Sequence, residues 1–303
     1  LPALRGLLHY AILQRQFAAV ADCAEALAQH LRDNDERYLH YMLAGVVSQE
    51  LLKDRARSQR AFLAGLRLLP EREEAFERLR QAYVGQTSTK EGAAALAELL
   101  TERLRHHSDS DSYQSSLRLE LAQLLAGPLG DRERAKAELR RAVEQAPNYA
   151  SALYALGKLL ADDTEWAGAV ELLERYSQLE QRPQQLVALH LLLADIYSDQ
   201  LKQPQKATTH FTKVLQLQPQ NQLALNKLAD VFLAQQKPAG ALPILRRLVK
   251  YTDDKAKKIG FFHRIAALSE LSGDNRGALE ALRQAVDVDP INLPALGELA
   301  KFG

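Results

Sequence analysis

The stretch at residues 105–112, RHHSDSDS, holds the side chains in this sequence that come nearest to a metal site. Two histidines and two aspartates can ligate a metal ion, and Asp109 and Asp111 have the D-x-D spacing that begins a calcium-binding loop. Counted from Asp109, such a loop needs glycine at position 6, where this sequence has Gln114, and adjacent histidines diverge on a helix. We therefore expect a solvated loop here, with no metal and no cofactor.

Sequence patterns that supply catalysis are missing as well. The chain has no P-loop, G-x-G-x-x-G, H-E-x-x-H, C-x-x-C or G-x-S-x-G pattern. The sequence therefore indicates neither phosphate binding nor zinc nor a catalytic nucleophile. We expect no catalytic residues and no enzymatic activity in this chain.

The composition favours helices and disfavours several classes of partner. Of the 303 residues 47% are hydrophobic, Leu and Ala dominate among them, and β-branched residues are sparse, which is typical of an all-helical chain. The 39 Lys and Arg nearly balance the 38 Asp and Glu, so the basic excess typical of nucleic-acid binding is missing. No apolar run approaches 18 residues, so we expect no direct membrane insertion.

The compartment is left open by the sequence. The single cysteine, Cys23, cannot form a disulfide within the chain, which slightly favours the cytoplasm without excluding other places. The opening residues LPALRGLLHY are neither a signal peptide nor an initiator methionine sequence, so we expect the chain to be part of a longer protein.

The sequence repeats with a period of about 36 residues. Pro147, Pro219 and Pro290 each end a helical pattern and lie 72 and 71 residues apart, twice that period. An alanine early in each second helix sets the register, and the spacings between these alanines are 34, 38, 34 and 37 residues: Ala135, Ala169, Ala207, Ala241 and Ala278. A second series of small residues marks the first helices: Ala122, Gly157, Ala194, Ala229 and Ala266.

This pattern resembles the tetratricopeptide repeat (TPR) family. The copy that begins at Ala150 has matching residues at family positions 4, 7, 8, 11, 20, 24 and 27, namely Leu153, Leu156, Gly157, Leu160, Ala169, Leu173 and Tyr176. The copies ending at Pro147 and Pro219 each need one extra residue in the central turn, in GPLGD and SDQLKQ. The resemblance implies an all-α, right-handed superhelical solenoid of stacked antiparallel helix pairs.

The resemblance covers nearly the whole chain. We expect a single array over residues 1–303, with about eight helix pairs, of which the copies in 1–113 are weaker and those in 114–292 clearer. Residues 293–303 restart the pattern as a capping or truncated helix.

In the family the first helices line the concave groove of the superhelix, and positions 2, 5, 6, 9, 12 and 13 lie opposite the packing positions. The candidate groove residues are Tyr154, Lys158, Leu191, Asp195, Asn226, Lys227, Asp230, His263 and Arg264. Such a mixture of apolar and charged groups suits a peptide segment or a helix of a partner protein. We therefore predict a protein-interaction scaffold or adaptor that binds its partner in this groove.

Four of these candidates, Asn226, Lys227, His263 and Arg264, could together meet a carboxylate. Some family members hold a C-terminal carboxylate with Lys and Asn at positions 5 and 9, Asn at 6, and then Lys and Arg at 2 and 6. Only Arg264 matches that pattern in place, so we do not expect this clamp.

Two other functions are compatible with a helical array. The chain could be a structural spacer or a self-association module whose end repeats pair between chains. It could also be an RNA-binding helical repeat, although the near-zero net charge and the acidic groove residues Asp195 and Asp230 disfavour this reading.

Overall fold

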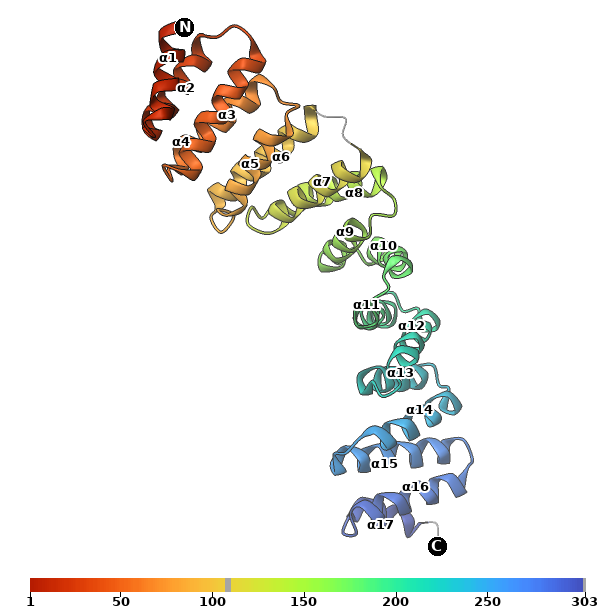
Figure 1. Ribbon diagram of the computed structural model, residues 1–303. Helices are drawn as coiled ribbons and strands as arrows, with labels where there is room; N and C mark the ends of the chain where they lie inside the picture. The colour runs from red at the N-terminus through yellow and green to blue at the C-terminus, as the bar shows by residue number, and fades with distance from the viewer. Residues whose placement is uncertain (107–109, 302–303) are drawn as a thin grey trace. The chain divides into compact units, whose positions relative to one another are not determined.

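The computed structural model describes residues 1–106 and 110–301. Within them it has seventeen α-helices and one π-helix, and no β-strand, so the all-α fold class is confirmed (Figure 1). Contacts divide the chain into two compact units, unit 1 over Leu1–Leu156 and unit 2 over Gly157–Gly303.

Unit 1 contains eight complete helices and the beginning of a ninth. They are α1 (Pro2–Leu13), α2 (Phe17–His30), α3 (Asn34–Glu50), α4 (Arg55–Leu68), α5 (Glu73–Val84), α6 (Lys90–His106), α7 (Asp111–Ala126), α8 (Arg132–Gln145) and the start of α9 (Ala150–Asp162).

Unit 2 continues with the end of α9. Its other elements are α10 (Trp166–Leu179), α11 (Pro183–Asp195), the π-helix η1 (Ile196–Gln200), α12 (Pro204–Leu217), α13 (Gln222–Ala234), α14 (Pro238–Tyr251), α15 (Lys255–Leu271), α16 (Asn275–Val288) and α17 (Leu293–Leu299).

Within each unit the helices pack mainly on their neighbours in the chain. Odd-numbered helices are the first helices and even-numbered helices the second helices of antiparallel pairs, joined by short turns. A single helix pair cannot bury its apolar stripe alone, so each pair depends on the next one for its core. The continuity of all pairs as one array over residues 1–303 stays a prediction.

The small residues that define the register lie where helices approach closely. Ala169, Ala194 and Ala229 are fully buried. A Cβ atom added to Gly157 would lie 2.8 Å from Cγ of Leu173 on α10, closer than real Cβ contacts come. Glycine inside a helix lowers helix stability by roughly 1 kcal/mol relative to alanine. The close approach of α9 and α10 explains why glycine nevertheless occurs at this position.

The turns inside the pairs share one backbone conformation, with a single exception. In seven turns the residue two positions before the second helix has a positive φ angle: Arg15, Lys53, Gly130, Thr164, Lys202, Gln236 and Gly273. This conformation closes the first helix with a bond such as Glu165 N–H to Leu160 O, at 2.8 Å. The turn between α5 and α6, residues 85–89, has no positive φ.

The two extra residues expected from the register are accommodated differently. GPLGD forms the five-residue turn 127–131 between α7 and α8. The extra residue in SDQLKQ lies not in the turn, as predicted, but in η1, where Leu201 N–H donates to Ile196 O at 2.9 Å. A π-helical bond spans one residue more than an α-helical bond, so a three-residue turn is kept.

Candidate partner-binding face

The candidate groove residues lie on four successive first helices. Tyr154 is on the part of α9 that belongs to unit 1 and is 42% exposed. The others are in unit 2, on α9, α11, α13 and α15: Lys158, Leu191, Asp195, Asn226, Lys227, Asp230, His263 and Arg264. None of the nine is buried. We call the surface that α11, α13 and α15 present at these positions the first-helix face of unit 2.

Lys227 on α13 contacts two carboxylates that come from the preceding pair. Its Nζ lies 3.2 Å from Oδ1 of Asp195 on α11 and 3.5 Å from Oδ2 of Asp199 in η1. The adjoining Asp195 carboxylate is the main cause of a raised pKa for Lys227, and Asp199 adds to it. The ammonium group is therefore charged at neutral pH and links α13 to α11.

The same arrangement recurs one repeat later. Nη2 of Arg264 on α15 lies 2.6 Å from Oδ1 of Asp230 on α13. In both cases an aspartate at position 9 of one first helix meets a cation at position 6 of the next. We call these two contacts the ionic ladder. Because its side chains are about one-third to two-thirds exposed, each pair contributes on the order of 0.5 kcal/mol.

The remaining polar candidates also have partners within the protein. Asn226 donates from Nδ2 to Gln222 O at 2.9 Å, within α13. His263 on α15 faces α17, with Nε2 3.2 Å from Oδ1 of Asn292 and Nδ1 3.4 Å from Oε2 of Glu298. Asn226, Lys227, His263 and Arg264 therefore do not point together at one open anion site.

Two family models match this sequence, and both describe the tetratricopeptide repeat. One covers residues 119–185 and the other residues 200–257. These two stretches are tetratricopeptide repeats. In the register taken from the sequence, the ionic ladder occupies repeat positions 6 and 9.

Similar solved structures include three that cover much of this chain. YrrB, described as a TPR protein with an unusual peptide-binding site, is 20% identical over 67% of this chain and 98% of its own, with a TM-score of 0.44. The C-terminal part of a TPR repeat-containing protein from Cytophaga hutchinsonii is 16% identical over 98% of this chain and 99% of its own, with a TM-score of 0.44. MamA is 17% identical over 58% of this chain and 92% of its own, with a TM-score of 0.42. No curated protein sequence matches the chain.

Sequence reasoning missed a polar cluster between α10, α11 and α12 of the TPR array. Tyr197 donates its hydroxyl to Oε1 of Glu174 at 2.6 Å, and its ring stacks on His210 with the centroids 5.5 Å apart. Nδ1 of His210 lies 3.2 Å from Nδ1 of His190. Because Nε2 of His210 faces Glu174 at 3.5 Å, we assign the proton to that nitrogen, and His190 then donates to His210.

Burial determines the protonation of this cluster. His190 and His210 are each 5% exposed and Tyr197 is 1% exposed. Burial lowers the pKa of His190 to about 4 and lowers the pKa of His210, with Lys213 adding to both shifts. Both rings are neutral at pH 7. The sequence contains no local signal for this cluster, because its members are separated by up to 36 residues and meet only through helix packing.

Part of the stretch first considered for metal binding, residues 107–109, lies outside the described residues. Arg105 and His106 belong to α6, and Ser110 caps α7, so the predicted loop is shorter than residues 105–112. In the described ranges no group of three or more His, Cys, Asp or Glu could hold a metal ion.

None of the helices seen in residues 1–106 and 110–301 has the length and apolar character needed to cross a membrane.

Proposed function

We propose that this TPR protein is an interaction scaffold, without catalytic activity of its own, that binds a peptide segment or helix of a partner protein on the first-helix face of unit 2. The ionic ladder is the observation that supports this most. A side chain in a half-exposed ion pair can leave its internal partner and pair with a charge of the partner protein instead. The loss of folding stability is small, because each internal pair contributes little to it. Charges placed this way favour encounter with a complementary partner and set its register.

Apolar side chains beside the ionic ladder would provide the apolar surface that is buried when the partner binds. Leu191 on α11 is half-buried, and Leu223 on α13 is 53% exposed. Binding energy in protein interfaces concentrates in such apolar anchors, surrounded by polar contacts. A partner segment with alternating apolar and charged side chains fits both features of this face.

The test starts by capturing partners with the intact chain and identifying them by mass spectrometry. The affinity of each partner is then measured for the native chain, for Lys227→Glu with Arg264→Glu, and for a control, Arg246→Glu with Arg283→Glu. The control makes the same charge change at exposed positions of the second helices α14 and α16. We expect at least about a tenfold loss for the first variant and little change for the control. A folded ladder variant with native affinity would contradict the proposal.

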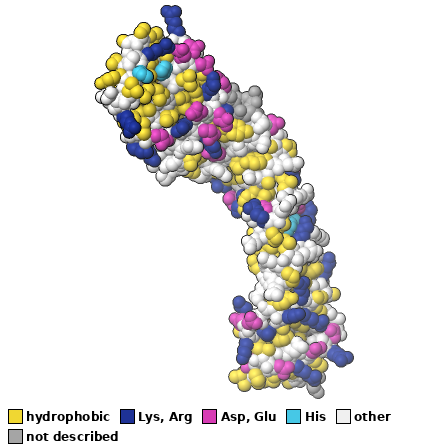
Figure 2. Space-filling view, viewed as in Figure 1, with side chains coloured by type: hydrophobic (Ala, Val, Ile, Leu, Met, Phe, Trp, Pro, Cys, Tyr) yellow, Lys and Arg dark blue, Asp and Glu magenta, His cyan; other side chains and the backbone are white. Residues whose placement is uncertain are grey.

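A second candidate function, self-association through the end repeats, is favoured by apolar side chains at the surface of both end helices. Leu7, Tyr10 and Leu13 on α1 are 55%, 56% and 65% exposed, and Leu293 on α17 is 78% exposed. Figure 2 shows apolar atoms at the surface over the N-terminal helices. Light scattering over a range of protein concentrations tests this function. A molecular mass that stays at 33.8 kDa would exclude it.

A further inference from the structure

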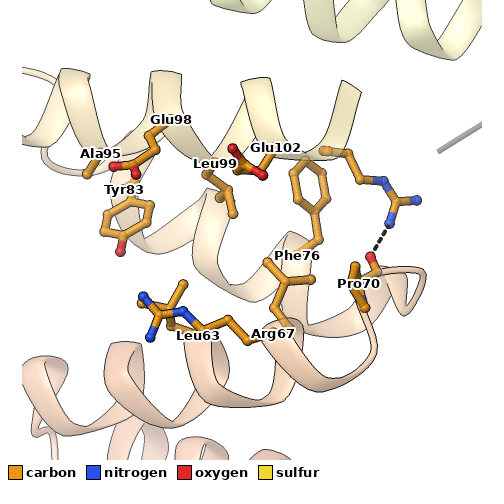
Figure 3. A pocket seen from close by; sticks show the side chains of 11 residues that line it. Leu63, Arg67, Pro70, Phe76, Tyr83, Ala95, Glu98, Leu99 and Glu102 are labelled. Carbon is orange, nitrogen blue, oxygen red and sulfur yellow. Dashed lines mark hydrogen bonds between the residues drawn. The ribbon is translucent and has the colours of Figure 1, made fainter. Parts of the chain in front are cut away.

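Unit 1 contains a cavity of about 560 Å³ between α4, α5 and α6 (Figure 3). Its lining is largely apolar and includes Leu63 from α4, Phe76 from α5 and Leu99 from α6. Phe76 is fully buried and Leu99 is 6% exposed, whereas Leu63 is half-buried. A cavity of this volume with an apolar floor is within the range of ligand-binding pockets.

The cavity coincides with the pair that departs most from the regular repeat. Seven second helices in the described residues span 14 residues each, but α6 spans 17 and follows the one turn without a positive φ. The long α6 carries Arg103, which is 6% exposed and lies over the Phe76 ring, 5.1 Å from its centroid. Nη1 of Arg103 donates to Pro70 O at 3.3 Å. These contacts link α6 to α5 and to the α4–α5 turn beside the cavity.

Opposite charges line opposite walls of this cavity. Arg67 is on α4 and Glu98 on α6, with the Tyr83 ring between them (Figure 3). Arg67 and Glu98 are both exposed, and neither has a hydrogen bond or an ion pair with another residue in the described ranges. The Tyr83 hydroxyl points toward the α4 side. Unlike the cations of the ionic ladder, these groups do not have to give up an internal ion pair before they meet the charge of a ligand.

Unit 2 has a hollow at the equivalent place in the repeat, and the volumes and linings of the two hollows can be compared. It lies between α14, α15 and α16, has a volume of about 360 Å³, and is lined on its second-helix walls by Arg246, Glu280 and Gln284. The corresponding walls in unit 1 carry Leu63, Leu66 and Leu99. The packing of three helices therefore leaves a hollow of this kind in both units, and the one in unit 1 is larger and has leucines on both second-helix walls.

We propose that the cavity between α4, α5 and α6 binds a segment of a partner protein that inserts one large apolar side chain, Leu, Met or Phe. A basic residue of that segment pairs with Glu98 and an acidic residue pairs with Arg67. The occupant follows from charge complementarity across an apolar floor. This site lies in unit 1 and involves second helices, so it is independent of the first-helix face of unit 2.

The probe is a labelled, blocked, alanine-based helical peptide of about 15 residues. It carries a central Phe, a Glu about four residues before it and a Lys about four residues after it, so that all three lie on one face. Two further peptides replace the Phe with Ala or carry Glu at both charged positions. Binding to the whole chain is measured by fluorescence anisotropy, and the peptide with Phe and both charges should bind most tightly.

Ala95→Phe fills the cavity, because Ala95 on α6 lines it. The matched control is Ala94→Phe, since Ala94 is exposed and lines a different hollow, next to α7 and α8. We expect Ala95→Phe to weaken binding about tenfold, and Ala94→Phe to leave it within about a factor of two. Equal affinity of the two variants, or no binding of the Phe peptides to the native chain, would overturn the proposal.

Glu98→Arg provides a second test that does not disturb the core, because Glu98 is exposed. This variant has cations on both walls, so it should prefer the peptide with two glutamates over the original peptide. An unchanged order of preference would show that the charges do not recognise the segment.

Discussion

The space enclosed by a second helix and the next helix pair is tightly packed at one place in unit 2 and hollow at one place in unit 1. In unit 2 the space between α10, α11 and α12 contains the packed side chains of His190, Tyr197 and His210, all 5% exposed or less. In unit 1 the space between α4, α5 and α6 is a cavity of about 560 Å³, and its Tyr83 is only half-buried. The repeat therefore determines where the space lies, and individual side chains determine whether it is filled.

Both places coincide with a departure from the regular repeat. The filled space adjoins η1, whose extra residue lies in the same turn of helix as Tyr197. The hollow space adjoins α6, which is longer than the other second helices and follows an irregular turn. Local departures of this kind are frequent at functional sites.

The largest expected difference between the two places is the cost of removing a tyrosine ring. Tyr197→Ala should lower the free energy of unfolding by about 3–5 kcal/mol, because it empties a fully packed position. Tyr83→Ala should cost about 1 kcal/mol, because its ring is half-exposed and already borders a cavity. Urea denaturation of both variants measures this. Similar costs would show that the two spaces are equally packed.

The second difference concerns pH, because histidines occur in the filled space and not in the lining of the hollow. Burial lowers the pKa of His190 to about 4 from 6.5. Above pH 6.5 His190 is mostly neutral in both the folded and the unfolded chain, so its burial does not make stability depend on pH there. Between pH 6.5 and 4 the unfolded chain binds a proton that the folded chain excludes, so stability falls, by about 3 kcal/mol in all.

Thermal unfolding as a function of pH measures this loss, and below about pH 4 the contribution of His190 should level off. His190→Gln with His210→Gln is the control, since it removes both titrating groups. A control variant that loses as much stability in this window as the native chain would assign the pH dependence to other groups.

The turns provide a third, smaller comparison. Thr164 has a φ of 64°, which is unfavourable for a β-branched residue, so Thr164→Gly should raise stability by about 1 kcal/mol. Ser88 is the residue two positions before α6 and lacks a positive φ, so Ser88→Gly should give no such gain. Melting temperatures of the two variants test this, and equal effects would mean that the turns do not differ in strain.

The smallest expected effect is that of the ionic ladder on stability. A double-mutant cycle of Asp230→Ala and Arg264→Ala should give a coupling energy below about 1 kcal/mol, because both side chains are more than one-third exposed. The coupling should decrease further at about 1 M salt. A salt-independent coupling above about 2 kcal/mol would contradict the proposal that the ladder can exchange its partners.

Much of the fold could be predicted from the sequence because its signals are local. The all-α class followed from Leu and Ala content, and the helix pairs followed from small residues such as Gly157 and Ala169 at a constant spacing. The place of the extra residue before Lys202 was predicted wrongly. Whether one more residue lengthens a turn or forms a π-helix depends on packing against α12, which the local pattern does not contain.

The candidate site could be predicted only as a set of surface positions. Lys227 lies on an accessible helix face, and its role in partner binding stays a prediction, but its contacts with Asp195 and Asp199 were not anticipated. Helical periodicity tells which side of a helix a residue occupies, and it contains no information on the distance to a residue of another helix.

The sequence by itself therefore determined the helices, their pairing and the faces they bury, since these follow from contacts within a few residues and from a repeat of about 36 residues. The tertiary structure decided which aspartate meets which cation, that two histidines and a tyrosine fill one space between three helices, and that the corresponding space in unit 1 stays open. These outcomes depend on side chains that are distant in the sequence, on the length of α6 and on one π-helical turn, and they exist only once the helices have packed.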